Sequence, residues 1–493
     1  MYSSKSSSGK TSGKAGAPAE VRHSDPQMQR LIQAVINAGH GHVFQWWHTL
    51  DDAGKQSLLQ QISLIDIAYL SDLYRSRREK APAPSLQEIT PAAVIGLPKS
   101  EEESVLHLGA RRIGEKALQA GEVAAFVVAG GQATRLGVDV PKGAMEITPV
   151  KRKPIFQTHA EKILALSKRH GRSIPFYIMT SESNDRPTRE FFEKNRNFGL
   201  DPANIFYFCQ GMMPALDFEG KLVLDAKDHI FTSPNGHGGS IFALQRSGAL
   251  DDMKRRGIKY IFYFQVDNVL INLADPVFLG YHIEAGAEMS AKVTAKRDAE
   301  EKVGVICQVN GKTTVIEYSD LSDEQRYAKN PDGSLRFSAG SIAIHVLNVD
   351  FVERLNLKEN TLPFHIAEKA IPHLSSEGKL VKPRKKNGLK FEMFVFDALS
   401  LAEKTVVMEV DRNEEFAPVK NAEGEDSPQT ARDLMVRLYA KWLNDAGAPV
   451  PRDKQGNVLG AIEISPLFAL DFEELRSKLP LSYEVRLPLY LGP

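Results

Sequence analysis

The chain has 493 residues, of which 42% are hydrophobic and 25% are charged, and its 62 Lys and Arg balance its 62 Asp and Glu. This length suits about three domains with large buried cores, so the fold needs no disulfide or metal to stabilise it. A formal net charge of zero argues against a protein that binds nucleic acid or an anionic membrane through its overall charge.

The cysteines and the hydropathy bear on the compartment. Cys209 and Cys307 are the only cysteines, which is too few for a disulfide framework in so long a chain. No apolar stretch reaches the roughly 18 residues of a membrane helix, and the N-terminus lacks the apolar segment of a secretory signal. We therefore expect a cytoplasmic protein with no membrane or nucleic-acid partner, either a monomer or a weak homo-oligomer.

The N-terminal part of the chain divides into a tail, a helical region and a linker. Residues 1–24 are mostly Ser, Gly, Lys and Ala, and we expect them to be disordered because they can bury too little apolar surface. Within residues 25–100, apolar residues recur at helical spacing over 28–36 and again over 58–65, which predicts an N-terminal helical region. The two prolines within residues 80–85 mark a linker or crossover.

Between residues 101 and 400, short apolar runs typical of strands alternate with amphipathic runs typical of helices. This alternation predicts an α/β domain with a mainly parallel sheet, in which ligands bind beyond the carboxyl ends of the strands. Residues 401–493 are more mixed, and we assign them to a small C-terminal domain. The expected strands are 123–129, 175–180, 205–210, 260–266, 289–294, 304–309, 341–347 and 406–410, and the expected helices are 155–167, 188–195, 239–246, 277–285 and 431–446.

The strongest chemical motif follows the first of these strands. Gly130 and Gly131 come directly after an apolar run, and Arg135 and Lys142 lie further along the same loop. Paired glycines let backbone N–H groups approach a phosphate, and the two cations suit a triphosphate. The spacing matches neither a dinucleotide-binding loop nor a P-loop. A tight turn with solvated cations is the plainer alternative.

Two other strands also end in polar groups. Asp267 follows the apolar run 260–264, and a carboxylate in this place could hold Mg²⁺ between phosphates or could merely cap a turn. Gln210 follows the strand 205–209, and its amide offers the donor and acceptor that match the imide edge of uracil. The loops after three separate strands thus predict a nucleotide site.

These motifs resemble, in order, those of the eukaryotic-type UDP-sugar pyrophosphorylases, and most of all the UDP-N-acetylhexosamine pyrophosphorylases. The resemblance implies a Rossmann-like nucleotidyltransferase domain with a mixed, mainly parallel sheet. It also implies an enzyme that converts UTP and a sugar 1-phosphate to a UDP-sugar and pyrophosphate, with Mg²⁺ or Mn²⁺ as cofactor. The sugar substrate that it implies first is N-acetylglucosamine 1-phosphate. The resemblance covers residues 100–440, with further matching stretches at 210–215, 234–239, 265–270, 315–318, 394–397 and 416–421.

The resemblance assigns a role to each matching residue, and each role has an ordinary structural alternative such as core packing, helix capping or a solvated surface. The residues assigned to catalysis are Arg135, Lys142 and Lys420; to the nucleotide, Gly130, Gly131, Gln210 and Gly236; to the sugar, His237, Asn268, Gly304, Glu317, Ser341, Phe394 and Phe396; and to the metal, Asp267 and Asp397.

Two departures from the family pattern leave the sugar open. Ser341 stands where the family usually has an Asn beside the 2-substituent of the sugar, and His237 stands where the animal enzymes have Asn. They keep a UTP–glucose-1-phosphate or broad-specificity UDP-sugar pyrophosphorylase as the alternative. A non-catalytic UDP-sugar sensor is opposed by the retained phosphate-binding cations. A glycosyltransferase is disfavoured because Asn268 and Val269 follow Asp267, so that the usual Asp-x-Asp is absent.

Overall fold

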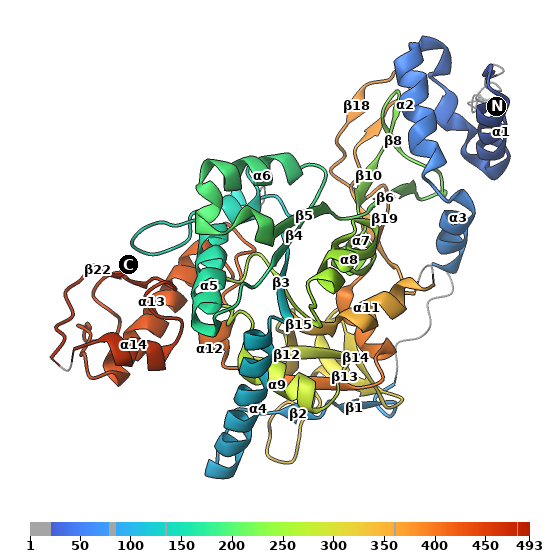
Figure 1. The fold of residues 1–493 in the computed structure, drawn as a ribbon. Coiled ribbons are helices and arrows are strands. Elements are labelled where there is room, and N and C mark those ends of the chain that lie inside the picture. The colour runs from blue at the N-terminus through green and yellow to red at the C-terminus, as the bar shows by residue number, and fades with distance from the viewer. Residues whose placement is uncertain (1–20, 78–84, 134–135, 359–360, 481) are drawn as a thin grey trace, which may run out of the picture. The chain divides into compact units, whose positions relative to one another are not determined.

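The computed structural model describes residues 21–77, 85–133, 136–358, 361–480 and 482–493 (Figure 1). Most of the tail predicted to be disordered, most of the predicted linker and the candidate catalytic residue Arg135 therefore lie outside the described residues. In the part of the chain that is described, no helix is long and apolar enough to cross a bilayer.

The chain forms two compact units. One contains residues up to Lys80 together with Met212–Ser233 and Ile366–Phe391, and the other contains Ala81–Gly211, Pro234–His365 and Glu392–Pro493. This division differs from the domain boundaries predicted at residues 100 and 400. Two segments of the predicted catalytic domain join the N-terminal helices, and residues 401–493 join the larger unit because their helices share its core. Every candidate site residue that the structure describes belongs to the larger unit.

The smaller unit combines the predicted N-terminal helices with short strands. An aspartate caps each of the three helices, since the side chains of Asp25, Asp51 and Asp66 accept hydrogen bonds from the first helical turns. These three helices lie within residues 25–100, where the helical region is predicted, and the short strands β1 (Ile89–Pro91) and β2 (Val94–Ile95) lie there as well. The elements are α1 (Pro26–Val35), α2 (Asp52–Ser63), α3 (Ile67–Ser76), β6 (Met212–Pro214), β7 (Leu216–Asp217), β8 (Leu224–Ala226), β9 (His229–Ile230), β10 (Thr232–Pro234), β16 (His365–Lys369), β17 (His373–Leu374), β18 (Leu380–Val381) and β19 (Gly388–Glu392).

One sheet organises the larger unit, with the strand order β2-β20-β12-β15-β11-β3-β4-β5 and with β1, β13 and β14 beside this path. Strand β15 is antiparallel to both of its neighbours along this order, and the other neighbouring pairs are parallel. The expected mixed, mainly parallel sheet is confirmed. The strands are β1 (Ile89–Pro91), β2 (Val94–Ile95), β3 (Val123–Val128), β4 (Phe176–Thr180), β5 (Ile205–Cys209), β11 (Tyr260–Gln265), β12 (Met289–Ala295), β13 (Val305–Val309), β14 (Lys312–Ile316), β15 (Ala339–Asn348) and β20 (Thr405–Glu409), with β21 (Ile462–Ile464) and β22 (Leu489–Leu491) as a separate pair.

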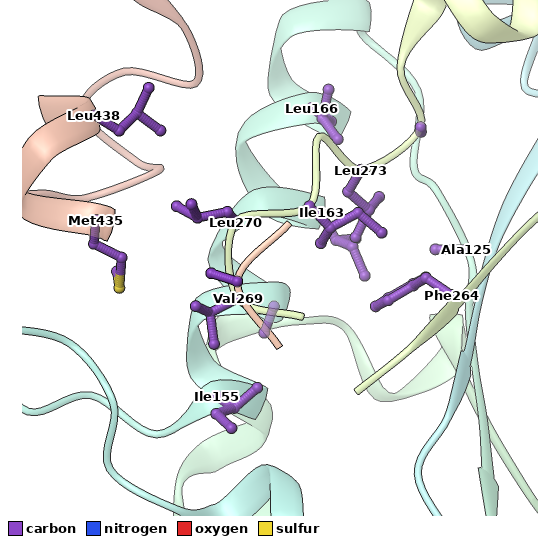
Figure 2. Close-up of a cluster of buried hydrophobic side chains, with 14 of the residues drawn as sticks. Ala125, Ile155, Ile163, Leu166, Phe264, Val269, Leu270, Leu273, Met435 and Leu438 are labelled. Atoms are coloured by element: carbon purple, nitrogen blue, oxygen red, sulfur yellow. The ribbon is translucent and has the colours of Figure 1, made fainter. Parts of the chain in front are cut away.

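Helices cover both faces of this sheet. Along β3, Ala125 and Val127 face one buried cluster while Ala124 and Phe126 face another, because successive side chains of a strand point to opposite sides. Figure 2 shows part of the first cluster, which α4 (Glu101–Ala120), α5 (Ile155–His170), α6 (Asp185–Lys194), α9 (Pro276–Glu284), α13 (Pro428–Asp445) and α14 (Phe472–Lys478) share. The second cluster lies beneath α7 (Ser240–Arg246), α8 (Ala249–Arg255) and α11 (Val349–Asn356), and the short helices α10 (Asp323–Arg326) and α12 (Arg412–Glu415) complete the unit.

Helix α4 was not among the individually predicted helices. It crosses α9 so closely that a Cβ on Gly114 would overlap the carbonyl of Pro276, and one on Gly280 would overlap that of Ala110. The two glycines therefore allow the helix backbones to touch. Helix α4 begins at the cap Ser100, whose hydroxyl accepts a hydrogen bond from the backbone of Glu103.

Candidate active site

Four parallel strands end at one edge of the sheet and gather the candidate nucleotide residues there. Val128, at the end of β3, pairs with Gln265 of β11 and with Met179 of β4. Thr180, which follows Met179, pairs with Cys209 of β5. The loops that begin after these residues therefore start side by side, as the carboxyl ends of parallel strands require.

The glycine loop after β3 lies directly against the predicted uracil reader. A Cβ on Gly130 would come within 2.6 Å of the side-chain nitrogen of Gln210, so the buried Gln210 amide rests on the Gly130 backbone. The side chain of Asn184 supports this loop from below by donating to the carbonyls of Ala129 at 2.9 Å and Gly131 at 3.3 Å. A nucleotide base and a phosphate could thus be held on adjacent backbone.

An ion pair joins the glycine loop to the loop after β11. The Lys142 amine lies 2.7 Å from a carboxylate oxygen of Asp267, and the two side chains are only 18% and 9% exposed. The backbone N–H of Lys142 also donates to the carbonyl of Gly131 at 3.2 Å. The structure thus brings Gly131, Lys142 and Asp267 together. The cation predicted for phosphate thus pairs with the carboxylate predicted for metal.

Hydrogen bonds join the loop that carries Lys420 to Asp267 and Asn268. Asn268 donates from its side chain to the carbonyl of Glu415 at 2.7 Å and accepts from the N–H of Ala417 at 2.9 Å, and the carbonyl of Asp267 accepts from Val419 at 3.1 Å. The Asn268 amide therefore positions a loop here, and its contact with the sugar stays a prediction.

The side chain of Lys420 is half exposed at this site. Its amine lies 3.4 Å from the Asp426 carboxylate. Lys142 and Lys420, the candidate catalytic lysines, are thus both paired with acids.

Three of the predicted sugar residues meet around the start of β15. The N–H of Ser341 donates to the carbonyl of Gly304 at 2.8 Å, and a Cβ on Gly304 would lie 3.1 Å from a carboxylate oxygen of Glu317. Burial raises the pKa of Glu317, against the attraction of nearby His365. A half-buried carboxyl therefore lies beside the backbone that joins Gly304 to Ser341, and its oxygens can accept hydrogen bonds from the hydroxyl groups of a ligand.

An aromatic stack forms the neighbouring wall. The ring of Phe394 lies between those of His365 and His237, with centroids 4.3 and 5.3 Å away. Nδ1 of His237 accepts from the N–H of Val395, and burial, with the charge of His365, lowers the pKa of His237 to about 4. His237 is therefore neutral near pH 7. Phe396 is buried in the second core cluster, and its ring also contacts those of Phe394 and His237, so its role at the sugar stays a prediction.

The loop that enters α7 brings Gly236 to this wall. Gly236 has a φ of +84°, and a Cβ there would lie 2.7 Å from the backbone nitrogen of Met393. Hydrogen bonds of 2.8 Å join Gly238 and Asn235 to Met393, and Asn235 also donates its N–H to Gly211 at 3.0 Å. The loop thus connects the residue after Gln210 to the segment that carries Phe394.

The two predicted metal ligands have different partners. Asp397 accepts a hydrogen bond from Nε2 of His365 at 2.8 Å, whereas Asp267 pairs with Lys142. The hydrogen bond and charge of Asp397 raise the pKa of His365, although burial opposes this. No three metal-ligating side chains cluster among the described residues. Asp267 still fits Mg²⁺, which often binds one or two carboxylates together with substrate phosphates.

Comparison with known proteins agrees with this geometry. The model of the UTP–glucose-1-phosphate uridylyltransferase family matches residues 86–464. The chain belongs to this family. It is 39% identical over 438 residues to the UDP-N-acetylglucosamine pyrophosphorylase of Saccharomyces cerevisiae, covering 85% of this chain and 91% of the yeast protein. It is 37% identical over 469 residues to the UDP-N-acetylhexosamine pyrophosphorylase-like protein 1 of Xenopus tropicalis, covering 89% and 92%.

A solved structure of the same kind matches the fold. The uridine diphosphate N-acetylglucosamine pyrophosphorylase of Trypanosoma brucei, in complex with an inhibitor, superposes with a TM-score of 0.80 at 27% identity, covering 96% of this chain and 99% of that chain. The resemblance to UDP-sugar pyrophosphorylases that the motifs indicated is confirmed.

Sequence reasoning missed two residues of this uridylyltransferase site. Asn184 lies in the loop after β4, so a search of every loop that follows a parallel strand would have found it. His365 stands far from any glycine-rich or strand-end motif, and only the packing against Phe394 and Asp397 brings it to the site.

Proposed function

We propose that this chain is a uridylyltransferase that makes a UDP-sugar and pyrophosphate from UTP and a sugar 1-phosphate, with N-acetylglucosamine 1-phosphate as its main sugar substrate. The observation that carries this proposal is the Lys142–Asp267 pair at the sheet edge, next to the contact between Gly130 and Gln210. Membership of the family supports the reaction class.

The reaction needs positioning and charge neutralisation more than acid–base chemistry. A sugar phosphate is already an anionic nucleophile, so its oxygen can attack the α-phosphorus of UTP in line without a protein base, and pyrophosphate leaves. The barrier is largely the repulsion between two polyanions. Lys142 and Arg135 would neutralise the triphosphate and the leaving pyrophosphate, and Lys420 would hold the sugar phosphate.

To contact phosphate oxygens, Lys142 and Lys420 would have to exchange their carboxylate partners. Lys142 would leave Asp267 for a phosphate oxygen, and Lys420 would leave Asp426 in the same way. Asp267 would then hold Mg²⁺ or Mn²⁺, whose charge helps two phosphate esters to approach each other. Asp397 could join as a ligand through the carboxylate oxygen that does not accept from His365.

The remaining candidates divide between base and sugar. Gln210, supported by Gly130, would read uracil, with Gly236 beside the base or ribose. Glu317 would accept hydrogen bonds from sugar hydroxyls, with Gly304 allowing the close approach. The neutral His237 and the ring of Phe394 would line the sugar pocket.

Ser341 supports one alternative, a UTP–glucose-1-phosphate or broad-specificity enzyme. Its side chain is short and sits where the backbone already bonds to Gly304, beside Glu317. A hydroxyl offers less to an N-acetyl group than a carboxamide does.

A pyrophosphate-release assay tests the proposal. UTP is incubated with glucose, galactose, N-acetylglucosamine or N-acetylgalactosamine 1-phosphate, each with and without Mg²⁺. We expect the highest kcat/KM for N-acetylglucosamine 1-phosphate and dependence on the metal. Preference for glucose 1-phosphate would favour the alternative. Tight UDP-sugar binding without pyrophosphate release from any pair would show a sensor and overturn the proposal.

Lys142→Ala is expected to lower kcat by about 10²–10³, by analogy with the loss of one transition-state donor, while the chain stays folded. The control is Lys151→Ala, an exposed lysine of the following segment with no assigned role in the site. Circular dichroism checks that each variant is folded, and a pyrophosphate-release assay measures kcat. Wild-type turnover in Lys142→Ala would remove this residue from the mechanism.

A further inference from the structure

Two side chains on one face of α5 fasten the loop that carries Asp267. His159 donates from Nε2 to the carbonyl of Val266 at 2.9 Å, and the Lys162 amine donates to the carbonyls of Val269 at 2.8 Å and Ile271 at 2.7 Å. Residues three apart share a face of a helix. Three carbonyls of one loop are thus held by one helix.

Burying either side chain at this position costs free energy. Burial lowers the pKa of His159 to about 3, so its ring is neutral, and burial lowers the pKa of Lys162 to about 7, against the attraction of Glu415. An apolar residue would avoid the cost of removing an amine from water. The neighbours of Lys162 on α5, Ile163 and Leu166, pack in the apolar cluster with Leu270 and the rest of this loop (Figure 2).

The hydrogen bonds that position the Asp267 loop continue to the loop that carries Lys420. Asp267 lies between the carbonyls that His159 and Lys162 hold, and its own carbonyl accepts from Val419. The Asn268 side chain bonds the segment that leads to Lys420 at two points. A shift of the loop near residues 269–271 would therefore move both Asp267 and Lys420.

We propose that Lys162 is a positioning residue for uridylyl transfer, which holds Asp267, and through Asn268 also Lys420, in place without touching either substrate. This inference rests on the proposed function for its kinetic consequence. The contact itself does not depend on that function, because the amine and the two carbonyls are all groups of this chain.

A cavity beside Lys162 makes this role testable by chemical rescue. It has a volume of about 330 Å³ and is lined by Lys162 and Leu166 of α5, the loop residues Val269 and Ile271, and aromatic side chains of α13. A small alkylamine can therefore reach the space that a truncated Lys162 would leave, and it can donate to the same carbonyls.

Lys162→Met keeps the length of the side chain but removes its donors. We expect kcat to fall by about 10², the cost of a displacement of roughly 1 Å in a catalytic group, while KM for UTP changes little. Ethylamine should restore turnover to Lys162→Ala in a saturable way. Lys162→Arg should retain most of the turnover, because a guanidinium keeps donors and the cavity gives it room. The control is Lys168→Met, an exposed lysine of the same helix, which should match the wild type.

Amide hydrogen exchange of the substrate-free proteins separates this inference from the proposed function. Residues 266–272 should exchange faster in Lys162→Met than in the wild type or Lys168→Met. An unchanged kcat in Lys162→Met, or no response of Lys162→Ala to ethylamine, would overturn the positioning role. A wild type without transferase activity would overturn the proposed function. In that case, faster exchange of residues 266–272 in Lys162→Met would still show that Lys162 positions this loop, and unchanged exchange would refute it. Thermal unfolding checks that each variant is folded, and if Lys162→Met is not, the response of Lys162→Ala to ethylamine carries the test.

Discussion

At the scale of single residues, the site depends on close contacts that leave no room for a further atom. Gly130 has no side chain, and the amide of the buried Gln210 fills the place where one would stand. The backbone of the glycine loop therefore determines where the Gln210 amide lies. This contact links the predicted phosphate loop after β3 to the predicted base contact after β5.

Gly130→Ala should push the Gln210 amide away, because the new Cβ would lie 2.6 Å from its nitrogen and 3.0 Å from its amide carbon. We expect KM for UTP to rise about tenfold, the cost of about one hydrogen bond, with a smaller change in kcat. Steady-state kinetics measure this. Gly109→Ala is the control, since a Cβ there meets no atom within 4 Å. An unchanged KM would contradict the contact between Gln210 and the base.

At the scale of elements, a buried charge cluster joins three parts of the larger unit. Lys292 of β12 lies 2.7 Å from Asp275, which caps α9, and 2.6 Å from Glu415, the last residue of α12. Lys292 is fully buried, and its two partners raise its pKa although burial opposes this. The cluster fixes the start of the loop that Asn268 holds.

Lys292→Met should lower the free energy of unfolding by about 3–5 kcal/mol, because it leaves two carboxylates buried without a counter-charge. Urea unfolding followed by circular dichroism measures the change. The matched control is Lys254→Met, which breaks a surface pair with Glu353 and should leave the urea midpoint almost unchanged. Equal effects of the two variants would show that burial of the cluster does not matter for stability.

At the scale of the whole molecule, several histidines are buried as neutral rings. His159 and His345 are fully buried, and burial lowers the pKa of each to about 3. Both sit in the core of the larger unit, and the attraction of Asp267 offsets only part of what burial costs a second proton on His159. The folded chain therefore resists a protonation that the unfolded chain accepts at ordinary pH.

Stability should therefore fall as the pH is lowered from about 7 to 5. Below the ordinary histidine pKa of 6.5, the unfolded chain binds protons at these two positions and the folded chain does not. Below pH 6.5, each histidine should lower the free energy of unfolding by about 1.4 kcal/mol per pH unit. Above pH 6.5 neither state binds the proton, so this loss disappears. His345→Asn should reduce the slope of unfolding free energy against pH by one proton. An unchanged slope would mean that His345 is not buried neutral in solution.

Much of the larger unit could be predicted from the sequence, because hydrophobic periodicity and turn residues are local signals. The strand before Gly130 and the strand before Asp267 were both placed correctly, and the loops after them contain the pair that supports the proposed function. The motifs also indicated the family, which the comparisons confirm. Helix α4 was missed as an individual element, since its exposed half carries apolar residues such as Leu106 that blur its periodicity.

The sequence by itself determined the order of strands and helices, the residue types at the strand ends and the class of reaction that they suit. Only the tertiary structure decided which of those residues meet. Lys142 and Asp267 are 125 positions apart, and Lys162 and Ile271 are 109 apart. Asp397 was assigned to metal but lies with His365, which no motif marked. Periodicity reports the environment of a residue within a few turns, whereas the partner of a buried charge is chosen by packing between elements that are distant along the chain.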